Sequence, residues 1–351
     1  MTNRQQQPSR RQMLAVGGAA ALIGMVRPAR AGRQLTVADP GGPYSPGYRK
    51  AFYDPFEQET GIRIVDVARE AYPTAQFKAM VQTGSYIWDV CTLTNFDRDI
   101  LAAQELLAPI DLAATGDPGL MPGGVTPLWL GVDVYATVLA YRTDHFPAGG
   151  PQSWADVWDV ARFPGRRALH KSPIDTLEQA LMADGVPAPQ LYPLDVDRAF
   201  RSLDRIKPHV DVWWTGGAQS TQLLQSGEVD LCAMWNARAQ AAIDGGAPAR
   251  IVWHQGLYDI EGWAIPKGCP HIDMARQFVA FCAAAKRQAR FTGKLSYGPT
   301  NLRAYADIPP ARAAILPTAP ANLAEMAGAN GDWWRTHRAA VTERFNSWLL
   351  G

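Results

Sequence analysis

Acidic and aromatic side chains stand where predicted strands end and turns or helices begin. Asp175 lies at the start of a helix that follows a strand, Trp235 ends a strand, and Glu261 begins one. Tyr44 and Tyr297 lie in turns that contain glycine and proline. Because strand ends of an α/β protein meet at one face of the sheet, these side chains are predicted to lie together. Aromatic rings with a few carboxylates suit an organic cation, through cation–π contact and charge pairing.

A second chemical signal is the turn Gly216-Gly217, which is flanked by Trp214 and Gln219. A helix begins here, and the N–H groups of a helix start favour a carboxylate or a phosphate. An anion subsite beside carboxylates would fit a zwitterion better than a pure polyamine. Structural roles stay open for the same residues, since Trp235 could be a core residue and Asp175 could cap its helix.

The motifs of common enzymes are missing from the sequence. It has no GxGxxG after a strand, no GxxxxGK(S/T) loop, no HExxH and no GxSxG. The six histidines are scattered singly, and no Cys/His cluster has metal-ligand spacing. We therefore expect no cofactor, no metal and no enzymatic activity. An exported enzyme whose catalytic residues are distant in sequence is the weakest alternative.

The composition indicates a folded protein with a large core. Hydrophobic residues make up 47% and charged residues 19% of the 351 residues, which excludes disorder of the whole chain. The formal net charge is +1, although residues 1–31 carry five arginines and no acid. The rest of the chain has 29 basic and 33 acidic residues and no basic stripe, so no nucleic-acid partner is expected.

Residues 1–31 have the pattern of an export signal. Arg10-Arg11 are followed by an apolar run, 13–26, and by the small-x-small sequence Ala29-Arg30-Ala31. This pattern predicts a signal peptide, and the arginine pair followed by Met-Leu favours the twin-arginine route over an ordinary secretory signal. Either route predicts a periplasmic protein that begins near Gly32. No later stretch is long and apolar enough to span a bilayer.

The four cysteines leave the disulfide question open. Cys91 and Cys232 lie in strand-like runs and are predicted to be buried thiols. Cys269 and Cys282 could pair in an oxidising compartment, and the sequence does not decide whether they do.

Strands and helices alternate along most of the chain. Strands at 34–38 and 62–67 flank a segment, 45–60, whose aromatic residues recur at helical spacing. Such strand–helix–strand units build parallel sheets, so the sequence predicts an α/β fold. Further strands are predicted at 88–93, 135–141, 167–170, 211–215, 229–235, 250–253 and 261–265. Further helices are predicted at 75–83, 98–105, 154–160, 175–184, 196–206, 219–227, 272–286 and 336–349.

Six stretches, taken in their order and spacing, carry a family resemblance over most of residues 33–305. They are PFEQETGIRI (55–64), ELLAPID (105–111), SWADVWD (153–159), LLQSGEVDLCAMWNARA (223–239), EGWAIPKG (261–268) and YGPTNLRA (297–304). In them the chain resembles the periplasmic spermidine/putrescine-binding proteins of ABC importers, which are extracellular solute-binding proteins. The tail beyond these stretches is similar only loosely.

The resemblance implies a two-lobed α/β periplasmic binding protein of the Venus-flytrap type, with a hinge of crossing strands. Lobe one would comprise residues 33–140 plus 260–302. Lobe two would comprise residues 143–257 plus 303–351. A Pro/Gly-rich connection at 147–151 agrees with this division.

The resemblance also assigns roles to single residues. Trp235 takes the place of an aromatic wall for the polyamine chain, and Tyr297 takes that of a pocket tyrosine. Glu261 and Asp175 take the places of two acids that pair with amines. 

Other positions depart from the family pattern. A glycine-rich segment that ends at Tyr44 replaces a Trp-rich turn, and Asn95 stands where the family has a tyrosine. Asp259 replaces an aromatic residue, and Ser172 replaces a further acid. These departures indicate a rebuilt pocket, so the solute need not be spermidine or putrescine.

We therefore predict the periplasmic substrate-binding component of an ABC transporter, which captures a small amine-bearing solute, polyamine-like or zwitterionic, by hinge closure for import. Its partners would be the small-molecule solute and an inner-membrane permease, and the protein itself would be a monomer. A binder of an anion or a metal complex on the same fold is the alternative, in which the acids would lie off the site. The ligand-binding candidates are Tyr44, Asn95, Asp175, Trp214, Gln219, Trp235, Asp259, Glu261 and Tyr297.

Overall fold

The computed structural model describes residues 33–70, 73–112 and 119–351. Arg33–Gly351 form one compact unit, and the predicted signal peptide, 1–31, lies outside the described residues. Within the described residues, no helix is both long enough and apolar enough to cross a membrane.

The strands form one sheet with the order β2-β1-β3-β9-β5-β8-β6-β7. Their bounds are β1 Gln34–Asp39, β2 Arg63–Ala68, β3 Val90–Thr94, β5 Trp129–Arg142, β6 Arg167–His170, β7 Val212–Trp214, β8 Leu231–Trp235 and β9 Ala249–Ala264. The short strands β4 Val125–Thr126, β10 Gly298–Pro299 and β11 Met326–Gly328 pair with β5 or β9. The predicted strand–helix–strand units thus produce an α/β sheet.

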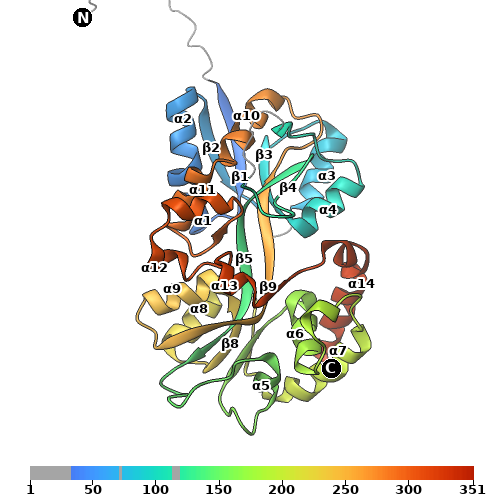
Figure 1. Ribbon diagram of the computed structural model, residues 1–351. Helices are drawn as coiled ribbons and strands as arrows, with labels where there is room; N and C mark the ends of the chain where they lie inside the picture. The colour runs from blue at the N-terminus through green and yellow to red at the C-terminus, as the bar shows by residue number, and fades with distance from the viewer. Residues whose placement is uncertain (1–32, 71–72, 113–118) are drawn as a thin grey trace, which may run out of the picture. The chain divides into compact units, whose positions relative to one another are not determined.

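Two parallel groups of strands are joined by a long antiparallel pair. β2-β1-β3 are parallel to one another, as are β8-β6-β7. Between the two groups run β5 and β9, which lie side by side along the length of the sheet (Figure 1). The sequence predicts two separate strands at 250–253 and 261–265, and that prediction is wrong, because β9 continues through Asp259.

The pairing of β5 with β9 is irregular in its middle. The register shifts between Thr137 and Leu139, whose partners on β9 are Leu257 and Val252. Gln255, in the intervening stretch of β9, has a φ of 60°, a left-handed conformation that is uncommon for a residue with a side chain. The two long strands are therefore not a uniform ladder where they pass from one strand group to the other.

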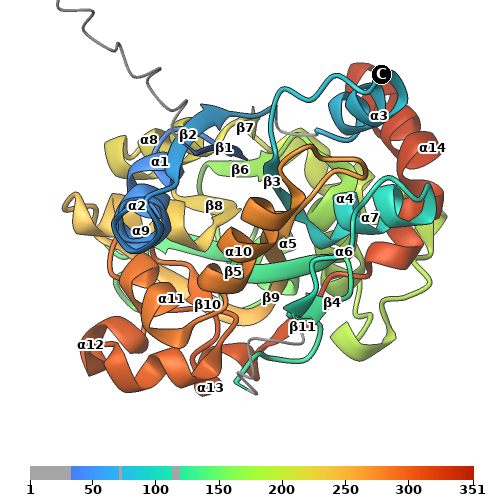
Figure 2. The same cartoon turned by 90° about the horizontal axis from the view of Figure 1, so that it is seen from above.

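Helices lie on both sides of the strands when the sheet is viewed from above (Figure 2). Their bounds are α1 Tyr44–Tyr48, α2 Asp54–Thr60, α3 Thr74–Thr83, α4 Asn95–Ala103, α5 Trp154–Trp158, α6 Pro173–Ala183, α7 Val196–Ile206, α8 Gly217–Ser226, α9 Asn236–Asp244, α10 Ile272–Cys282, α11 Ala285–Thr292, α12 Pro310–Ala313, α13 Pro320–Leu323 and α14 Gly331–Leu350. The helices predicted from the sequence do not include α9, and the predicted helix 272–286 joins α10 to the start of α11. Ser153 caps α5 through a hydrogen bond from the Asp156 N–H, which satisfies one of the N–H groups at the helix start.

Each group of strands has its own hydrophobic core. Phe52, Phe56 and Trp263 lie in the core beside β1–β3, and this part of the molecule is called the first region. Leu177, Phe200 and other residues of α5–α7 lie in the core beside β6–β8, which is called the second region. 

The C-terminal tail divides between the two regions. Ala304, Ile308 and Leu316 pack with Ala289 of α11, on the first region. Trp334, Val341 and Phe345 of α14 join the core of the second region. The sequence predicts that the whole segment 303–351 belongs with lobe two. The start of this segment packs on the first region instead.

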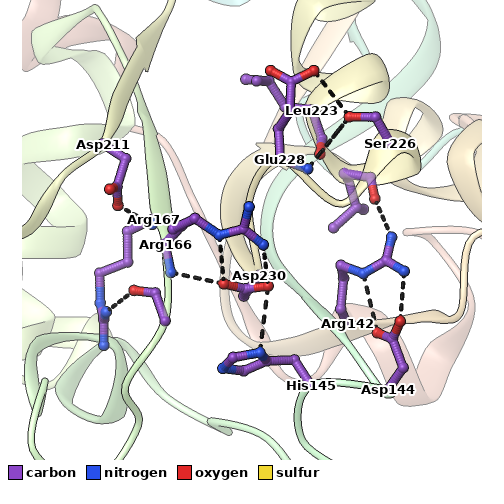
Figure 3. A network of polar contacts seen from close by, with 12 residues as sticks. Arg142, Asp144, His145, Arg166, Arg167, Asp211, Leu223, Ser226, Glu228 and Asp230 are labelled. Atoms are coloured by element: carbon purple, nitrogen blue, oxygen red, sulfur yellow. Dashed lines mark hydrogen bonds and ion pairs between the residues drawn. The ribbon is translucent and has the colours of Figure 1, made fainter.

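Polar contacts tie the strands of the second region together at their amino ends. The guanidinium of Arg166 donates to Asp230 at 2.9 Å and 3.1 Å, and the Arg166 N–H donates to the same carboxylate at 2.8 Å (Figure 3). Arg142 at the end of β5 donates to Asp144 and to the Leu224 carbonyl. These charges satisfy one another at the sheet edge opposite the carboxyl ends of β6 and β8, so they explain packing rather than ligand binding.

All four cysteines are buried free thiols in the structure. Burial raises the pKa of Cys91, Cys232 and Cys282. Cys269 and Cys282, whose pairing the sequence left open, are not bonded to each other here.

Candidate functional site

A cavity of about 360 Å³ lies where the first and second regions face each other. Several parallel strands deliver residues to it at their carboxyl ends. Pro40–Tyr44 follow β1, Arg69 follows β2, Thr94 ends β3, His170 ends β6 and Trp235 ends β8. This is the edge of an α/β sheet at which ligands bind as a rule.

Asp39 shapes the glycine-rich turn on the cavity rim. Its Oδ1 accepts hydrogen bonds from the Gly41 N–H at 2.7 Å and from the Ser45 hydroxyl at 2.6 Å. Its Oδ2 accepts one from Tyr53 at 2.9 Å. Gly41 has a φ of 73°, which glycine adopts without the strain that a Cβ would add. The turn thus places Tyr44 in the cavity wall.

Tyr44, Arg69, Glu261 and Tyr297 form what we call the first wall of the cavity. Arg69 and Glu261 make an ion pair, and each side chain is 5% exposed. The Arg69 Nε also donates to Thr92 at 2.8 Å. Burial works against the charge of Arg69, but Glu261 raises the pKa of Arg69 overall, so this guanidinium stays charged.

The two tyrosines of the first wall stack on each other. The ring centroids of Tyr44 and Tyr297 are 5.1 Å apart with an interplanar angle of 21°. Burial raises the pKa of Tyr297 to about 12 and that of Tyr44 well above its usual value. Both rings therefore present neutral aromatic surface to the cavity.

His170, Asp175, Trp235 and Arg238 form what we call the second wall. The carboxyl of Asp175 accepts one hydrogen bond from Thr137 at 2.7 Å. Burial raises the pKa of Asp175 to about 6, and no cation among the described residues offsets this shift. Its φ of 69° and ψ of −39° interrupt the first turn of α6. Such strained backbone is typical of binding sites.

His170 belongs to an aromatic stack at the end of β6. Its ring lies 4.1 Å from that of Trp214 at 12° and meets Trp235 edge-on at 5.6 Å. Burial lowers the pKa of His170 to about 4, so the ring is neutral. Its Nδ1 is buried and has no hydrogen-bond partner among the described residues.

Arg238 is the cation of the second wall. Its Nε is buried and lacks a hydrogen-bond partner in the described part of the chain, and no carboxylate there forms an ion pair with it. A Cβ on Gly217 would lie 2.6 Å from this Nε and 3.0 Å from the ring of Trp235. Gly217 therefore leaves room for Arg238 and Trp235, which is a different role from the predicted anion subsite at the helix start.

Arg338 reaches the cavity from the C-terminal helix α14. It pairs with Asp97 at 3.2 Å, and the Asp97 side chain is 1% exposed. Of the charged groups that line the cavity, Arg338 and Arg69 thus have carboxylate partners, whereas Arg238 and Asp175 have no partner of opposite charge among the described residues.

The structure brings five of the nine predicted candidates to the cavity lining: Tyr44, Asp175, Trp235, Glu261 and Tyr297. The other four lie elsewhere. Asn95 is the first residue of α4, between the lining residues Thr94 and Phe96. 

Trp214, Gln219 and Asp259 are displaced for different reasons. Trp214 is fully buried behind His170 and donates to the Ala233 carbonyl. Gln219 is exposed and accepts from the Thr215 N–H. Asp259 is inside β9 and accepts from Tyr135 at 3.1 Å, so the tyrosine and not the acid lines the cavity.

Three arginines and two rings of the site are not among the residues predicted from the sequence. Arg69, Arg238 and Arg338 are single basic residues with no motif around them. Tyr135 could have been found, because it alternates with inward-facing residues on a predicted strand. His170 is one of the scattered histidines, but its position at the end of a predicted strand could have indicated the site.

No metal site is found in the ranges that the structure describes, where no group of three or more His, Cys, Asp or Glu side chains could hold an ion. The site consists of rings, two ion pairs and two oppositely charged groups without a charge partner. Such an arrangement can bind and orient a small charged molecule.

The fold and the cavity define a class of protein: an α/β ligand-binding protein whose site lies between two regions joined by long crossing strands. The chain belongs to the bacterial extracellular solute-binding proteins, whose family model matches residues 51–318. 

The chain is also similar to two characterised relatives and to one solved structure. It is 37% identical over 322 residues to the gamma-aminobutyric acid-binding protein of Pseudomonas aeruginosa, covering 90% of this chain and 91% of that protein. It is 22% identical over 265 residues to the spermidine/putrescine-binding periplasmic protein of Escherichia coli K12, covering 71% and 73%. An ABC transporter substrate-binding protein from Bradyrhizobium japonicum USDA 110 superposes with a TM-score of 0.85 at 39% identity, covering 90% of this chain and 99% of that one.

These findings confirm the predicted family, the α/β periplasmic binding fold and the periplasmic location. The protein is a substrate-binding component of an ABC transporter and belongs to a family that binds solutes rather than transforming them.

Proposed function

We propose that the cavity binds a small zwitterionic amino acid whose ammonium and carboxylate are well separated, of the 4-aminobutyrate type. The observation that carries the proposal is the pair of unmatched charges in the second wall. Asp175 lacks a cation and Arg238 lacks an anion among the described residues, while Arg69 and Arg338 have carboxylate partners. One ammonium and one carboxylate would satisfy both.

A polyamine fits these charges less well. Its first ammonium would pair with Asp175, but its second would meet a cavity whose other acid, Glu261, already has a cation. Arg238 would then stay without an anion. The 37% identity to a gamma-aminobutyric acid-binding protein over nine-tenths of the chain supports the same choice.

The aromatic side chains supply the rest of the recognition. Trp235, Tyr44 and Tyr297 can cover the methylene chain of the solute, and a ring face beside an ammonium adds cation–π attraction. Tyr135 and His170 complete an apolar enclosure in which charge pairing is stronger than in water.

We further propose that the first and second regions act as two lobes, 33–140 plus 260–302 and 143–257 plus the α14 part of the tail, which close on the solute. The irregular pairing near Thr137 and the positive φ of Gln255 give β5 and β9 a place to bend. The protein would act as a monomer that delivers its solute to an inner-membrane permease.

Ligand binding to the purified protein tests the proposal. Differential scanning fluorimetry should show stabilisation by 4-aminobutyrate, because binding to the native state raises apparent stability by mass action, about 2.7 kcal/mol at a hundredfold excess over Kd. Butylamine and butyrate, each with one of the two charges, should give smaller shifts. A shift with putrescine and none with any amino acid would overturn the choice of solute.

Export by the twin-arginine route is a separate proposal, motivated by Arg10-Arg11 before the apolar run. Replacing both with lysine should leave the protein in the cytoplasm, as cell fractionation and blotting would show. Unchanged export of that variant would indicate an ordinary secretory signal.

A further inference from the structure

The Arg69–Glu261 ion pair is built into the cavity and is shielded from solvent. Arg69 follows β2, and Glu261 lies in β9, opposite Asp133 of β5 and Thr94 of β3. Both charged side chains are 5% exposed, yet both line the cavity. A cation that is part of the protein therefore neutralises one of the two carboxylates that a solute could reach.

Two further acids surround this pair. Asp133 is fully buried, accepts a hydrogen bond from Tyr48 at 2.7 Å and leaves its Oδ1 without a partner among the described residues. Asp259 lies two residues before Glu261 in the sequence, and both side chains point to the same side of β9. Burial raises the pKa of Asp133 and Asp259 above their ordinary values. Glu261 in the cavity wall thus has two further carboxyl groups behind it, and Arg69 is the cation that pairs with Glu261.

Arg69 is fixed in place by contacts from several segments. Its backbone N–H donates to the Asp39 carbonyl, its Nε donates to Thr92, and its Nη1 donates to the Glu70 carbonyl. An arginine held in this way loses little further entropy when the solute enters. These contacts and the ion pair with Glu261 fix the guanidinium at a defined position in the cavity wall.

We infer that Arg69 is a specificity-determining residue, because it occupies the place that the second ammonium of a diamine would take beside Glu261. The inference rests on the proposed function, in which Asp175 receives the only ammonium of the solute. A diamine is rejected since its second charge would meet a guanidinium instead of a carboxylate. Specificity of this kind depends on an unfavourable contact with the wrong ligand.

Substitution of Arg69 tests the inference. Isothermal titration at pH 7.5 would measure 4-aminobutyrate and 1,4-diaminobutane with the wild type, Arg69→Gln, Arg69→Lys and the double variant Arg69→Gln/Glu261→Gln. Arg69→Gln should bind the diamine about 10- to 100-fold more tightly than the wild type does, the range that one hydrogen bond to a charged group contributes. Arg69→Lys keeps a cation at this position and should reject the diamine.

Two controls test whether the diamine gain comes from the unpaired Glu261 carboxylate. One excludes the extra space that a smaller side chain leaves, and the other excludes the change in net charge of the cavity. The double variant has the same room as Arg69→Gln but no carboxylate, so it should gain no diamine affinity. Arg338→Gln also removes one lining cation, but it leaves behind Asp97, which does not line the cavity. It should not gain diamine affinity either.

A buried Glu261 without its cation could prevent folding of Arg69→Gln. That variant would then be refolded with each ligand in turn. If the variant folds in the presence of the diamine but not in the presence of 4-aminobutyrate, the inference is supported. If neither ligand restores folding, the inference is overturned. Equal diamine gain in Arg338→Gln would overturn it as well. If the wild type binds no amino acid, the proposed function fails; if it binds one and Arg69→Gln gains nothing, only the inference fails.

Discussion

The two walls of the cavity differ in how their charges are satisfied. In the first wall, Glu261 and Arg69 pair with each other. In the second wall, Asp175 is held only by the hydroxyl of Thr137, and the Nε of Arg238 has no partner within the described residues. The first wall is complete without a solute, whereas the second wall places an anion and a cation where only a ligand can match them.

This difference indicates where binding free energy and stability oppose each other. A buried carboxylate without a cation destabilises the folded protein, and a ligand ammonium removes that cost. Changes in the second wall should therefore weaken binding while they stabilise the unliganded protein. Changes in the first wall should alter which solute fits more than how strongly the proper solute binds.

The largest effect is expected for Asp175→Asn. Removing one partner of a buried charge pair costs about 2 to 5 kcal/mol, so 4-aminobutyrate affinity should fall by about 30-fold or more. Isothermal titration would measure the loss. Glu178→Gln is the matched control, because Glu178 lies one turn further along α6 and does not line the cavity. An affinity that survives in Asp175→Asn would show that the two walls do not differ as described.

The same variant should be more stable than the wild type without ligand. The pKa of Asp175 is about 6 in the folded protein, above the ordinary value of 3.8. Because the pKa is raised in the folded state, this carboxyl contributes its full stabilisation of the folded protein below about pH 4. That stabilisation is lost as the pH rises through 6. At pH 7.5, Asp175→Asn should avoid a cost of up to about 3 kcal/mol. Thermal unfolding at pH 4 and pH 7.5 should show the gain only at the higher pH.

The second largest effect is expected for Arg238→Gln. Losing the charged donor should weaken binding of 4-aminobutyrate by about 10- to 100-fold, as for one charge-assisted hydrogen bond. Butylamine has no carboxylate, so its weaker binding should not change. If butylamine and 4-aminobutyrate lose affinity equally, Arg238 supports the wall without contacting the carboxylate.

The third effect is the dependence of wild-type affinity on pH. An ammonium requires ionised Asp175, so binding should release a proton below about pH 6, and affinity should fall about fivefold between pH 6 and pH 5. Between pH 7 and pH 8 it should be nearly constant. Glu178, whose burial raises its pKa to about 7, is another group that titrates nearby. The dependence should persist in Glu178→Gln and disappear in Asp175→Asn.

Asp175 could be predicted from the sequence, because it begins a helix directly after a strand, and the carboxyl ends of the strands of an α/β sheet meet at one edge. Glu261 was expected to begin a strand but lies inside β9, and it reaches the site because β9 passes Thr94 at the carboxyl end of β3. The sequence does not contain the pairing of Glu261 with Arg69, since the two are 192 residues apart and Arg69 has no motif. Arg238 lies on α9, a helix that the periodicity did not reveal. 

The tryptophans and Asp259 show a second limit. Its place beside the Gly216-Gly217 turn predicts Trp214 in the site, but the stacked ring of His170 stands between it and the cavity. Asp259 has the same facing as Glu261 on β9, yet Tyr135 covers it. Alternation along a strand gives the side to which a residue points, and neighbouring chains determine what reaches the surface of that side.

The smallest effect is expected in the first wall, for Tyr297→Phe. The ring keeps its stacking on Tyr44, and the hydroxyl carries no charge because burial raises its pKa to about 12. Affinity for 4-aminobutyrate should change by less than about fivefold, since a neutral hydrogen bond contributes about 1 kcal/mol or less on balance. Titration beside Asp175→Asn would show the contrast between the two walls. A loss in Tyr297→Phe as large as that in Arg238→Gln would mean that the first wall also has a polar group that only the solute satisfies. The charge of the solute would then be recognised from both walls.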